Sequence, residues 1–407
     1  MSKTLLVLGG GPDQLFMIRT AKSMGLTTIV LDKDAEAPGF SVADYHAVVS
    51  TRDLTAMKDF VDQHKQRIGP VHGVSTMGSD IPQMVSALAH FLGTPAISPI
   101  SARWATEKYE MKERFREAGV ATPWYQLVDS AQVVREILVD RGVSMVIKPV
   151  DQAGSRGVSL IREAAEAEQL FAHAFENSGN GRVLLEEFVT GPQLSTESIM
   201  LDGEIITPGY ADRNYEEMQD FLPQIMENGG WVPSLYEEQR VTVEAMVKKA
   251  ALALGITNGV VKGDVVLSSA GPVIIEIAAR LSGGDFSESL VPLGTGINYV
   301  ETVIKLAIAE KPDPISLPPK QNLVVANRYF FAPPGTLLDI HGLDAIANLN
   351  WAAKLDIWYQ PGDRLPDIRS HGHRTGVFVV TGPDRETVQK RIDYVYKTVQ
   401  FDVSTEP

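Results

Sequence analysis

Short apolar runs alternate with helix-like segments over about the first 120 residues of this chain. The apolar runs are residues 5–8, 28–31, 46–49 and 73–75. A repeated order of strand and helix is typical of a parallel sheet that carries helices on its faces. We therefore expect an N-terminal parallel α/β domain over residues 1–120.

The end of this first domain is marked by the chemistry of a helix terminus. A charge-rich segment, Ser101 to Ala118, predicts a helix, and Gly119 and Pro123 favour its end. The chain has 407 residues, which exceeds one ordinary core. Two or three packed domains are therefore expected.

A second region follows in which strands and helices no longer alternate regularly. Strands are predicted at residues 144–148, 158–161, 183–188 and 194–201, and a helix at 297–308. Lys262–Leu267 and Val273–Ile277 flank a turn at 268–272 and predict a hairpin. This pattern indicates an α+β region over residues 121–310, with a central lid subdomain at about 121–190.

The last part of the chain begins after a cluster of prolines, Pro312, Pro314, Pro318 and Pro319, which predicts a linker. Short strands and one late helix, residues 385–399, follow the linker. We expect residues 321–407 to form a small C-terminal subdomain that closes over the preceding region.

Composition excludes several classes of function. The formal net charge is -14 and lysine and arginine are dispersed, so we expect no nucleic-acid partner. Cysteine is absent, which excludes disulfides, thiolate nucleophiles and cysteine-based zinc sites and fits a reducing compartment. The first apolar run is too short for a signal peptide, and no run is long enough to span a bilayer. We expect a cytoplasmic protein without a membrane partner.

The turn Gly9-Gly10-Gly11 follows the first predicted strand, and Asp32 ends the second. This order raises the possibility of a dinucleotide site. Gln14, however, stands where the dinucleotide pattern has a third small residue. A tight strand-to-helix connection or a small-ligand site explains the same glycines.

A lysine beside a glycine-bearing loop is the first candidate for phosphate binding, because the chain contains no G-x-x-x-x-G-K-[ST] motif. Lys148 lies on a predicted strand, and the loop Gln152 to Gly157, which includes Ser155 and Arg156, follows it. Loop amides and the lysine can both donate to phosphate oxygens while the loop folds over as a lid. The alternative is a surface lysine before a hairpin turn.

Two carboxylates end the strand at residues 183–188. Backbone groups of Glu187 and Val189, beside Phe188, would read an adenine edge, and the carboxylate of Glu186 would take a polar nucleotide group. Glu197, on the returning strand, is a second nucleotide candidate. Two glutamates at a strand end are more often simply solvated.

The sharpest feature is the pair of strands that carries Asp264 and Glu276. Strand alternation places Lys262 and Asp264 on one face, and Ile274 and Glu276 on one face of the next strand. Both carboxylates can therefore line one cleft. Magnesium prefers carboxylate and phosphate oxygens, so these two residues predict a metal site beside a triphosphate.

Arg280 lies four residues after Glu276 and precedes the flexible pair Gly283-Gly284. A guanidinium at this position could hold a developing acyl phosphate or tetrahedral oxyanion. A structural ion pair between Glu276 and Arg280 is the plainer reading.

Further candidates bear on the substrate. Ser75 to Asp80 follows a predicted strand, where amides at a helix start could bind a carboxylate or where the residues simply cap the helix. Residues 210–236 are expected to be long and irregular and to carry specificity through Asp212, Arg213 and Trp231. His371 and His373 form no metal site that the sequence can complete, and we assign them no role.

Taken in order, these motifs resemble the ATP-grasp superfamily. The residues that carry the resemblance are Lys108, Lys148, the loop to Gly157, Glu186-Glu187, Asp264 and the segment Glu276 to Arg280. The glycine turn at residues 9–11, Arg280-Leu-Ser-Gly-Gly284 and the small C-terminal subdomain are most similar to L-amino-acid ligases. The expected architecture is thus an ATP-grasp fold between an N-terminal parallel α/β domain and a C-terminal subdomain.

The resemblance implies ATP and Mg²⁺, or Mn²⁺ in its place, as cofactors. Lys108 and Lys148 would hold the α- and β-phosphates, Glu186 to Val189 would receive adenine, and Asp264 and Glu276 would bind the metal. Arg280 would hold the acyl phosphate, and a loop near Arg374 would close over the site. The partners would be a small carboxylic acid and an amine, and relatives of this kind are commonly homodimers.

Three positions depart from the family pattern. Ala278 replaces an asparagine that often completes the metal motif, and Gln193 stands where a ribose-binding glutamate is common. Gly284 replaces the glutamate that biotin carboxylases carry after the arginine, which argues against bicarbonate activation.

The sequence therefore predicts an ATP-dependent carboxylate-amine ligase that forms an amide or peptide bond on amino-acid substrates. Formate or bicarbonate activation by another ATP-grasp ligase is the first alternative. An NAD-dependent dehydrogenase, based on residues 9–11 and Asp32, and a non-catalytic nucleotide-binding module remain further alternatives.

Overall fold

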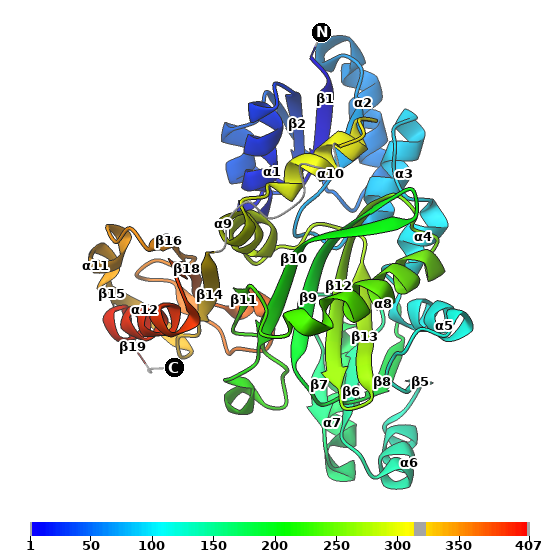
Figure 1. The fold of residues 1–407 in the computed structure, drawn as a ribbon, viewed down its shortest axis with the longest axis vertical. Helices are drawn as coiled ribbons and strands as arrows, with labels where there is room; N and C mark the ends of the chain where they lie inside the picture. The colour runs from blue at the N-terminus through cyan, green and yellow to red at the C-terminus, as the bar shows by residue number, and fades with distance from the viewer. Residues whose placement is uncertain (1, 313–322, 405–407) are drawn as a thin grey trace.

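A computed structural model describes residues 2–312 and 323–404 (Figure 1). Its N-terminal sheet is parallel, with the order β3-β2-β1-β4. The strands are β1 (Thr4–Leu8), β2 (Thr27–Asp32), β3 (Tyr45–Val48) and β4 (Gly73–Ser75). The alternation of strands and helices in the sequence thus predicted this sheet correctly.

Two pairs of helices cover the faces of the N-terminal sheet. The helices are α1 (Pro12–Ser23), α2 (Leu54–Ile68), α3 (Pro82–Leu92) and α10 (Tyr299–Ala307). Leu5 and Val7 of β1 pack with α1 and α10, whereas Leu6 and Leu8 pack with α2 and α3. Helix α10 comes from late in the chain yet lies beside α1 and β1 (Figure 1). The predicted division at residue 120 stays a prediction, but this core draws on both sides of it.

The predicted helix Ser101 to Ala118 is wrong in one respect, because the structure has two helices there. These are α4 (Pro99–Trp104) and α5 (Lys108–Ala118). The carboxylate of Glu107 accepts a hydrogen bond from Glu110 N at 2.6 Å and so caps the start of α5. The break places Lys108 at the first position of α5.

A four-stranded sheet with the order β5-β8-β6-β7 and two helices form the region predicted as a lid. The strands are β5 (Tyr125–Val128), β6 (Met145–Pro149), β7 (Ser159–Ile161) and β8 (Val183–Glu187), and the helices are α6 (Ala131–Arg141) and α7 (Ala167–Asn177). Both helices contribute to one apolar core with β6 and β8. We call this unit the lid sheet.

The largest sheet has eight strands in the order β13-β12-β9-β10-β11-β14-β18-β16. Its strands are β9 (Gln193–Leu201), β10 (Glu204–Asn214), β11 (Gly229–Val232), β12 (Gly259–Ser268), β13 (Gly271–Ala278), β14 (Val324–Phe330), β16 (Ala352–Ile357) and β18 (Gly376–Gly382). Helices α5 and α8 (Arg240–Ala253) pack on β12 and β13. Because β10 and β11 occupy parts of residues 210–236, the expectation of a wholly irregular segment is wrong.

The C-terminal subdomain continues this sheet, since β11 pairs with β14. It also contains a three-stranded sheet and two helices: β15 (Gly335–His341), β17 (Arg364–Leu365), β19 (Gln400–Ser404), α11 (Leu343–Ala347) and α12 (Arg385–Thr398). Shorter helical pieces are α9 (Val291–Thr295), a π-helical turn at Phe286–Leu290 and 3-10 turns at Pro38–Ser41, Ala164–Glu166, Met218–Phe221, Glu237–Gln239 and His371–His373. Pro314, Pro318 and Pro319 of the predicted linker lie outside the described residues.

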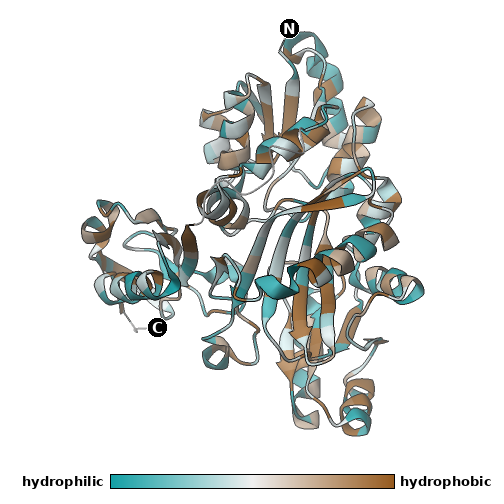
Figure 2. Cartoon of the chain, in the orientation of Figure 1, coloured by the Kyte–Doolittle hydropathy of each residue, from teal (hydrophilic) through white to brown (hydrophobic). Residues whose placement is uncertain are grey.

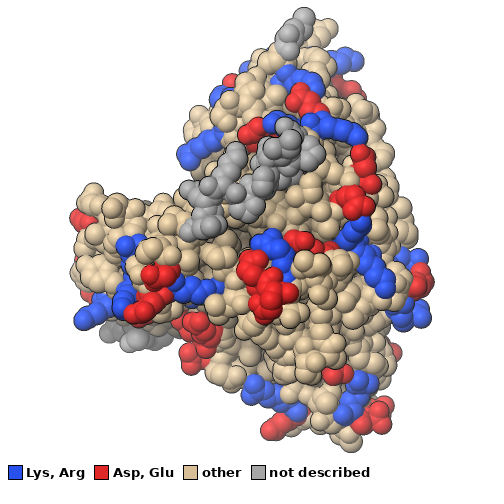
Figure 3. Space-filling model, in the orientation of Figure 1, with Lys and Arg blue, Asp and Glu red and all other residues tan. Residues whose placement is uncertain are grey.

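Apolar residues gather along the inner strands, whereas outer helices such as α12 are largely hydrophilic (Figure 2). On the face shown in Figure 3, lysine and arginine are mixed with aspartate and glutamate. Among the described residues, no helix combines the length and apolarity needed to cross a bilayer.

Candidate active site

Helix α5 turns two lysines toward the eight-stranded sheet, because Lys108 and Lys112 are one helical turn apart. Lys108 Nζ donates to Gln152 O at 2.6 Å and lies 3.6 Å from Glu276 Oε2. Burial acts to lower the pKa of Lys108, but the carboxylates of Glu276, Asp80 and Glu186 hold it above its usual value. Lys108 therefore stays charged where these carboxylates meet.

Lys148 and Glu186 lie on neighbouring strands of the lid sheet. Lys148 Nζ is 2.8 Å from Glu186 Oε2, and Lys112 Nζ is 3.2 Å from Glu186 Oε1. Burial lowers the pKa of Lys112 to about 8, while Glu186 opposes this shift. The sequence analysis missed Lys112, although its position one turn after Lys108 could have indicated it.

Asp264 and Glu276 are directly opposite each other on β12 and β13, so both carboxylates share one face of the sheet. Asp264 pairs with Arg213 NH1 at 2.9 Å and also with Lys262. Burial acts to raise the pKa of Glu276, but surrounding cations, Lys108 foremost, hold it well below its usual value. The structure thus brings the two acidic residues and the lysines together, as the sequence predicted.

A bulge in this hairpin corrects one detail of the predicted alternation. Glu276 pairs with Asp264, but Ile274 pairs with the next residue, Val265, which leaves Ile275 as the extra residue. Ile274 is therefore fully buried in the apolar core with Val265, not on the face of Glu276. The backbone oxygen of Ile275 accepts a hydrogen bond from Lys112 Nζ at 3.2 Å.

We call the eight charged side chains of this region the ion-pair network: Lys108, Lys112, Lys148, Glu186, Arg213, Lys262, Asp264 and Glu276. Members come from α5, the lid sheet and three strands of the eight-stranded sheet. The five cations outnumber the three carboxylates of the network, and they still outnumber the carboxylates when Glu227, which pairs with Arg213, is included. This excess favours an anionic ligand.

Arg280 lies beside the ion-pair network, where the chain leaves β13 and meets the N-terminal domain. Arg280 Nε is 3.6 Å from Asp80 Oδ1, and both atoms are buried without a hydrogen-bond partner among the described residues. Leu281 pairs with Met77, and Gly78 N donates to Leu281 O at 3.1 Å. Two loops predicted separately, residues 75–80 and 280–284, are thus adjacent.

The glycines after Arg280 allow this close approach. A Cβ on Gly283 would lie 2.7 Å from Asp13 Oδ2 and 3.0 Å from Gly78 Cα. Gly284 has a φ of +63°, and its carbonyl accepts a hydrogen bond from Tyr329 Oη at 2.9 Å. The pair therefore joins the N-terminal domain to the C-terminal subdomain, with Ser75 itself buried at the end of β4.

The glycine-bearing loop after Lys148 forms hydrogen bonds with residues that lie outside the lid sheet. Ser155 has a φ of 58°, and its Oγ donates to Ile225 O at 3.1 Å and contacts His371 Nε2 at 3.2 Å. Arg156 is exposed, and Gly157 is buried against Asn177 and Pro149.

Arg374 is buried and stacks 3.5 Å from the centre of the Tyr329 ring. Its NH2 donates to Glu227 O at 2.6 Å, and Arg213 Nε donates to Glu227 Oε2 at 2.8 Å. The sequence analysis missed Glu227, because no local pattern shows that two distant arginines converge on it.

A side chain of the protein occupies the space beside the N-terminal glycine turn. Gln14 occupies the space above Gly9, where an added Cβ would lie 2.9 Å from its Cδ. Asp32 accepts hydrogen bonds from Gly10 N at 2.7 Å and Asp34 N at 2.9 Å. These contacts favour a tight strand-to-helix connection over a dinucleotide site.

Comparison with known proteins favours the ATP-grasp alternative over a dinucleotide-binding protein. Residues 105–284 match the model of the ATP-grasp domain, and residues 328–404 match L-amino acid ligase C-terminal domain 2. Residues 105–284 of the chain therefore form an ATP-grasp domain. The C-terminal match makes the chain similar to the L-amino acid ligases as well.

Individual relatives agree with this placement. The ATP-grasp protein is 25% identical over 395 residues to an uncharacterized protein y4rH of Sinorhizobium fredii, covering 95% of this chain and 80% of that one. It is 27% identical over 263 residues to a formate-dependent phosphoribosylglycinamide formyltransferase of Haloquadratum walsbyi, covering 62% of this chain and 61% of that one. An L-amino acid ligase structure from Bacillus licheniformis has a TM-score of 0.83 at 20% identity and covers 99% of both chains. The structural likeness establishes the predicted fold.

Asp212 and Trp231 do not join the ion-pair network of the ATP-grasp protein, and their role as substrate residues stays a prediction. They are cross-strand partners on β10 and β11. Asp212 accepts from Arg385 NH2 at 2.6 Å, and Trp231 is 5% exposed within the C-terminal apolar core. Arg213, one residue later, faces the opposite side because side chains alternate along a strand.

Glu197 also has partners that differ from the predicted nucleotide contact. Its fully buried carboxylate accepts hydrogen bonds from Ser282 Oγ at 2.6 Å, Tyr299 Oη at 2.7 Å and Ser195 Oγ at 3.2 Å. Burial raises the pKa of Glu197. It therefore supports the loop after Arg280 through Ser282.

Part of the predicted adenine hinge is already engaged in backbone pairing. Glu187 N donates to Trp124 O at 2.9 Å, and Phe188 N donates to Ser144 O at 3.0 Å. The Glu187 carboxylate pairs with Arg141 at 2.9 Å. The role of the hinge, including Val189, stays a prediction.

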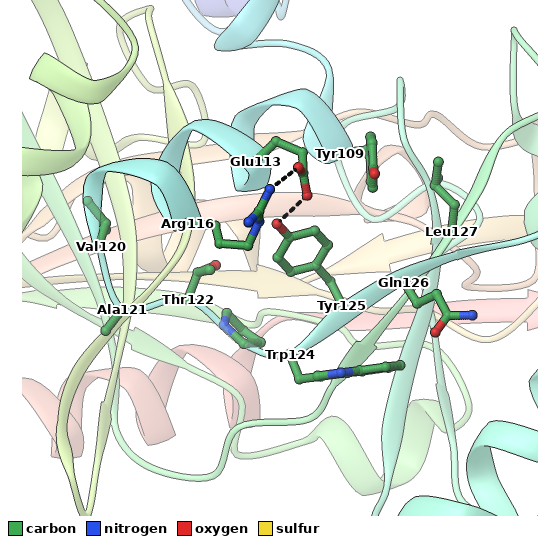
Figure 4. A pocket seen from close by; sticks show the side chains of 12 residues that line it. Tyr109, Glu113, Arg116, Val120, Ala121, Thr122, Trp124, Tyr125, Gln126 and Leu127 are labelled. Atoms are coloured by element: carbon green, nitrogen blue, oxygen red, sulfur yellow. Dashed lines mark hydrogen bonds and ion pairs between the residues drawn. The ribbon is translucent and has the colours of Figure 1, made fainter.

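A groove of about 840 Å³ lies on another face of α5 (Figure 4). Tyr109, Glu113 and Arg116 line it together with residues 119–127. These helical positions differ from those of Lys108 and Lys112, and Tyr125 Oη donates to Glu113 Oε1 at 2.7 Å. None of the predicted site residues lines this groove.

The ATP-grasp protein offers two facing carboxylates, Asp264 and Glu276, to a divalent cation. Among residues 2–312 and 323–404, no group of three or more histidine, aspartate or glutamate side chains is placed to hold a metal. Mg²⁺ is commonly bound by one or two carboxylates with phosphate and water oxygens, so this donor set fits a nucleotide-bound Mg²⁺.

Proposed function

We propose that this ATP-grasp protein joins a carboxylic acid to an amine, with conversion of ATP to ADP and phosphate through an acyl phosphate. The observation that carries the proposal is the ion-pair network, in which Lys108 meets Glu276 within 3.6 Å beside the strand partner Asp264. Such an arrangement of cations and carboxylates suits a metal-bound triphosphate.

The chemistry explains why such a site is needed. A free carboxylate is a poor electrophile, and its oxygen is a poor leaving group. Attack of the carboxylate on the γ-phosphate releases ADP and forms a mixed anhydride, whose carbonyl the amine then attacks with loss of phosphate and a proton. The protein contributes mainly position and charge.

We assign Lys108 and Lys148 to the phosphates of ATP, and Ser155, Arg156 and Gly157 to the loop that covers them. Asp264 and Glu276 would hold Mg²⁺, which when bound neutralises phosphate charge. The adenine would lie against residues 186–189. Neighbouring cations, Lys108 foremost, keep the pKa of Glu276 low, so this carboxylate is ionised.

Arg280 is assigned to the acyl phosphate. Its Nε is buried beside Asp80 without a hydrogen-bond partner among the residues described, so a bound anion would satisfy a donor that is otherwise costly to bury. The adjoining loop, residues 75–80, approaches the same position from the N-terminal domain.

We propose amino acids as the substrates. The match of residues 328–404 to an L-amino acid ligase domain supports this choice. Arg374 lies in that segment and contacts Glu227, and the two would provide opposite charges to a zwitterion.

Formate activation is the second candidate, because a formate-dependent formyltransferase aligns over 62% of this chain. That relative's name refers to a phosphoribosyl substrate, which would require additional cations for its phosphate. The ligase and its alternatives require different small-molecule substrates.

The test is phosphate release from ATP and Mg²⁺ with pooled amino acids, followed by mass spectrometry of the products. A ligase releases phosphate only when both an acid and an amine are present. Release that requires formate or bicarbonate would replace the proposal with the second candidate. A chain that binds ATP without turnover would be a nucleotide-binding module.

A further inference from the structure

The loop predicted to cover the nucleotide is fastened to the C-terminal subdomain at His371. His371 N donates to Gly154 O at 3.1 Å, and its Nε2 lies 3.2 Å from Ser155 Oγ. Two hydrogen bonds therefore connect a segment of the C-terminal part of the chain, more than 200 residues away in sequence, to two successive residues of the loop.

The direction of the side-chain bond follows from the serine's single proton. Ser155 Oγ donates that proton to Ile225 O at 3.1 Å, so it accepts from His371 Nε2–H. Burial and the positive charges of Arg374 and Arg213 hold the pKa of His371 well below its usual value. We therefore assign a neutral imidazole with its proton on Nε2.

The same loop region has a second attachment. Leu160 N donates to Pro223 O at 2.7 Å, and Ser159 forms a bridge with Gln224. Residues 223–225 are followed by Glu227, which contacts Arg374, three residues after His371. His371 thus lies where the lid sheet, this segment and the C-terminal subdomain meet.

We propose that His371 is a positioning residue that holds the loop at Gly154 and Ser155 in its closed arrangement, so that the C-terminal subdomain controls access to the nucleotide site. The effect on nucleotide binding rests on the proposed function, whereas the effect on the loop does not. Ser155 is strained at a φ of 58°, and without the two bonds this residue would relax.

Trypsin cleavage after Arg156 tests the loop directly, because this residue is exposed within it. We expect His371→Ala to speed that cleavage about three- to tenfold, the loss corresponding to one hydrogen bond. Ser155→Ala removes this bond and also the bond to Ile225 O, so it should speed cleavage at least as much. The double variant should cleave no faster than Ser155→Ala, because the bond to His371 is already lost in that single variant. His371→Gln, whose amide can donate from a similar distance, should restore slow cleavage.

His373→Ala is the matched control, since this histidine lies in the same 3-10 turn. Among the described residues, its side chain forms one hydrogen bond, accepted from Arg369 N at 3.1 Å. Its cleavage rate should equal that of the wild type. Equal rates for His371→Ala and the wild type would overturn the proposal, as would equal acceleration by His373→Ala. Thermal unfolding of each variant identifies general destabilisation.

Kinetics provide the functional readout. We expect His371→Ala to raise the KM for ATP more than it lowers kcat, with rescue by His371→Gln. A change confined to kcat would overturn the positioning role. If turnover is absent in the wild type, the ligase proposal fails, while the cleavage rates still decide the role of His371.

Discussion

Glu197 and Glu276 extend from the same face of the eight-stranded sheet, yet their surroundings differ completely. Glu197 lies opposite Lys262 in the strand register, but its carboxylate accepts hydrogen bonds from three hydroxyl groups. Burial raises the pKa of Glu197. Glu276 has lysines around it and a lowered pKa. Hydroxyl donors support a structural carboxylate, whereas cations keep a carboxylate ionised for a metal. We call the first set, Glu197, Ser195, Ser282 and Tyr299, the hydroxyl cluster.

The largest expected effect on activity is that of Arg280, which lies between the hydroxyl cluster and the ion-pair network. Arg280→Ala should lower product formation by roughly 10³-fold, because a positioned charge on the reacting group is lost. ATP binding should remain within about twofold, since Arg280 is assigned to the intermediate. Initial rates and nucleotide titration measure the two quantities.

Arg135→Ala is the control for Arg280→Ala, since Arg135 pairs on the surface with Glu168 at 2.7 Å. It should leave both quantities unchanged. Wild-type turnover by Arg280→Ala would remove the arginine from the reaction.

Glu276→Gln tests the ion-pair network itself. We expect ADP formation to fall by roughly 10²-fold, because a neutral amide is a poor ligand for a hard cation. The Mg²⁺ concentration that gives half-maximal rate should rise. An unchanged Mg²⁺ dependence would exclude Glu276 from the metal site.

Lys112→Met should reduce the free energy of unfolding by about 2 kcal/mol, since Glu186 loses one of its two buried cations. The pH dependence has a defined sign. The folded-state pKa of Lys112 is about 8, below the unfolded value, so the wild type gains stability as pH rises from about 8 toward 10.5. Urea unfolding across this range should show a smaller gain in the variant; an equal gain would contradict the shift.

Glu197→Gln should have the smallest effect, less than about 1 kcal/mol at pH 7 and little change in activity, because the amide retains an acceptor for the hydroxyls. Its pH response sharpens the contrast with Glu276. A raised folded-state pKa makes wild-type Glu197 less favourable as pH rises above about 4.5. The variant should therefore gain relative to the wild type over that range. Glu276→Gln should instead lose relative to the wild type as pH rises toward about 4.5, because the folded-state pKa of Glu276 is lowered.

Parallel slopes for the two glutamine variants would break the comparison. They would place Glu197 and Glu276 in equivalent electrostatic surroundings. Urea unfolding at several pH values provides both slopes.

The sequence predicted features that depend on local order. Strand alternation located Asp264 and Glu276 on one face, and the order of strands and helices predicted the parallel N-terminal sheet. The same reasoning misplaced Ile274, because a bulge adds a residue that alternation does not anticipate. It also grouped Asp212 with Arg213, although neighbours on a strand face opposite sides.

Contacts between residues far apart in the chain could not be predicted from the sequence. Glu227 meets Arg374 because β11 and β18, which follow these two residues, both pair with β14, and no residue pattern near either position records those pairings. His371 likewise gains a partner, Ser155, only through the arrangement of the lid sheet. The roles assigned to the individual site residues remain predictions that the variants above will test.

Helix α10, from late in the chain, completes the apolar core of the N-terminal domain. The N-terminal domain therefore cannot be separated as residues 1–120 alone. Val300, Val303 and Ile304 cover one side of the first sheet, packed against Leu5 and Val7. A recombinant fragment that stops at residue 120 would leave this apolar side open to water, and we expect it to aggregate on gel filtration. A peptide carrying residues 291–308, supplied in trans, should restore a monodisperse fragment, so exchange of N-terminal segments between ligases must carry this late helix with it.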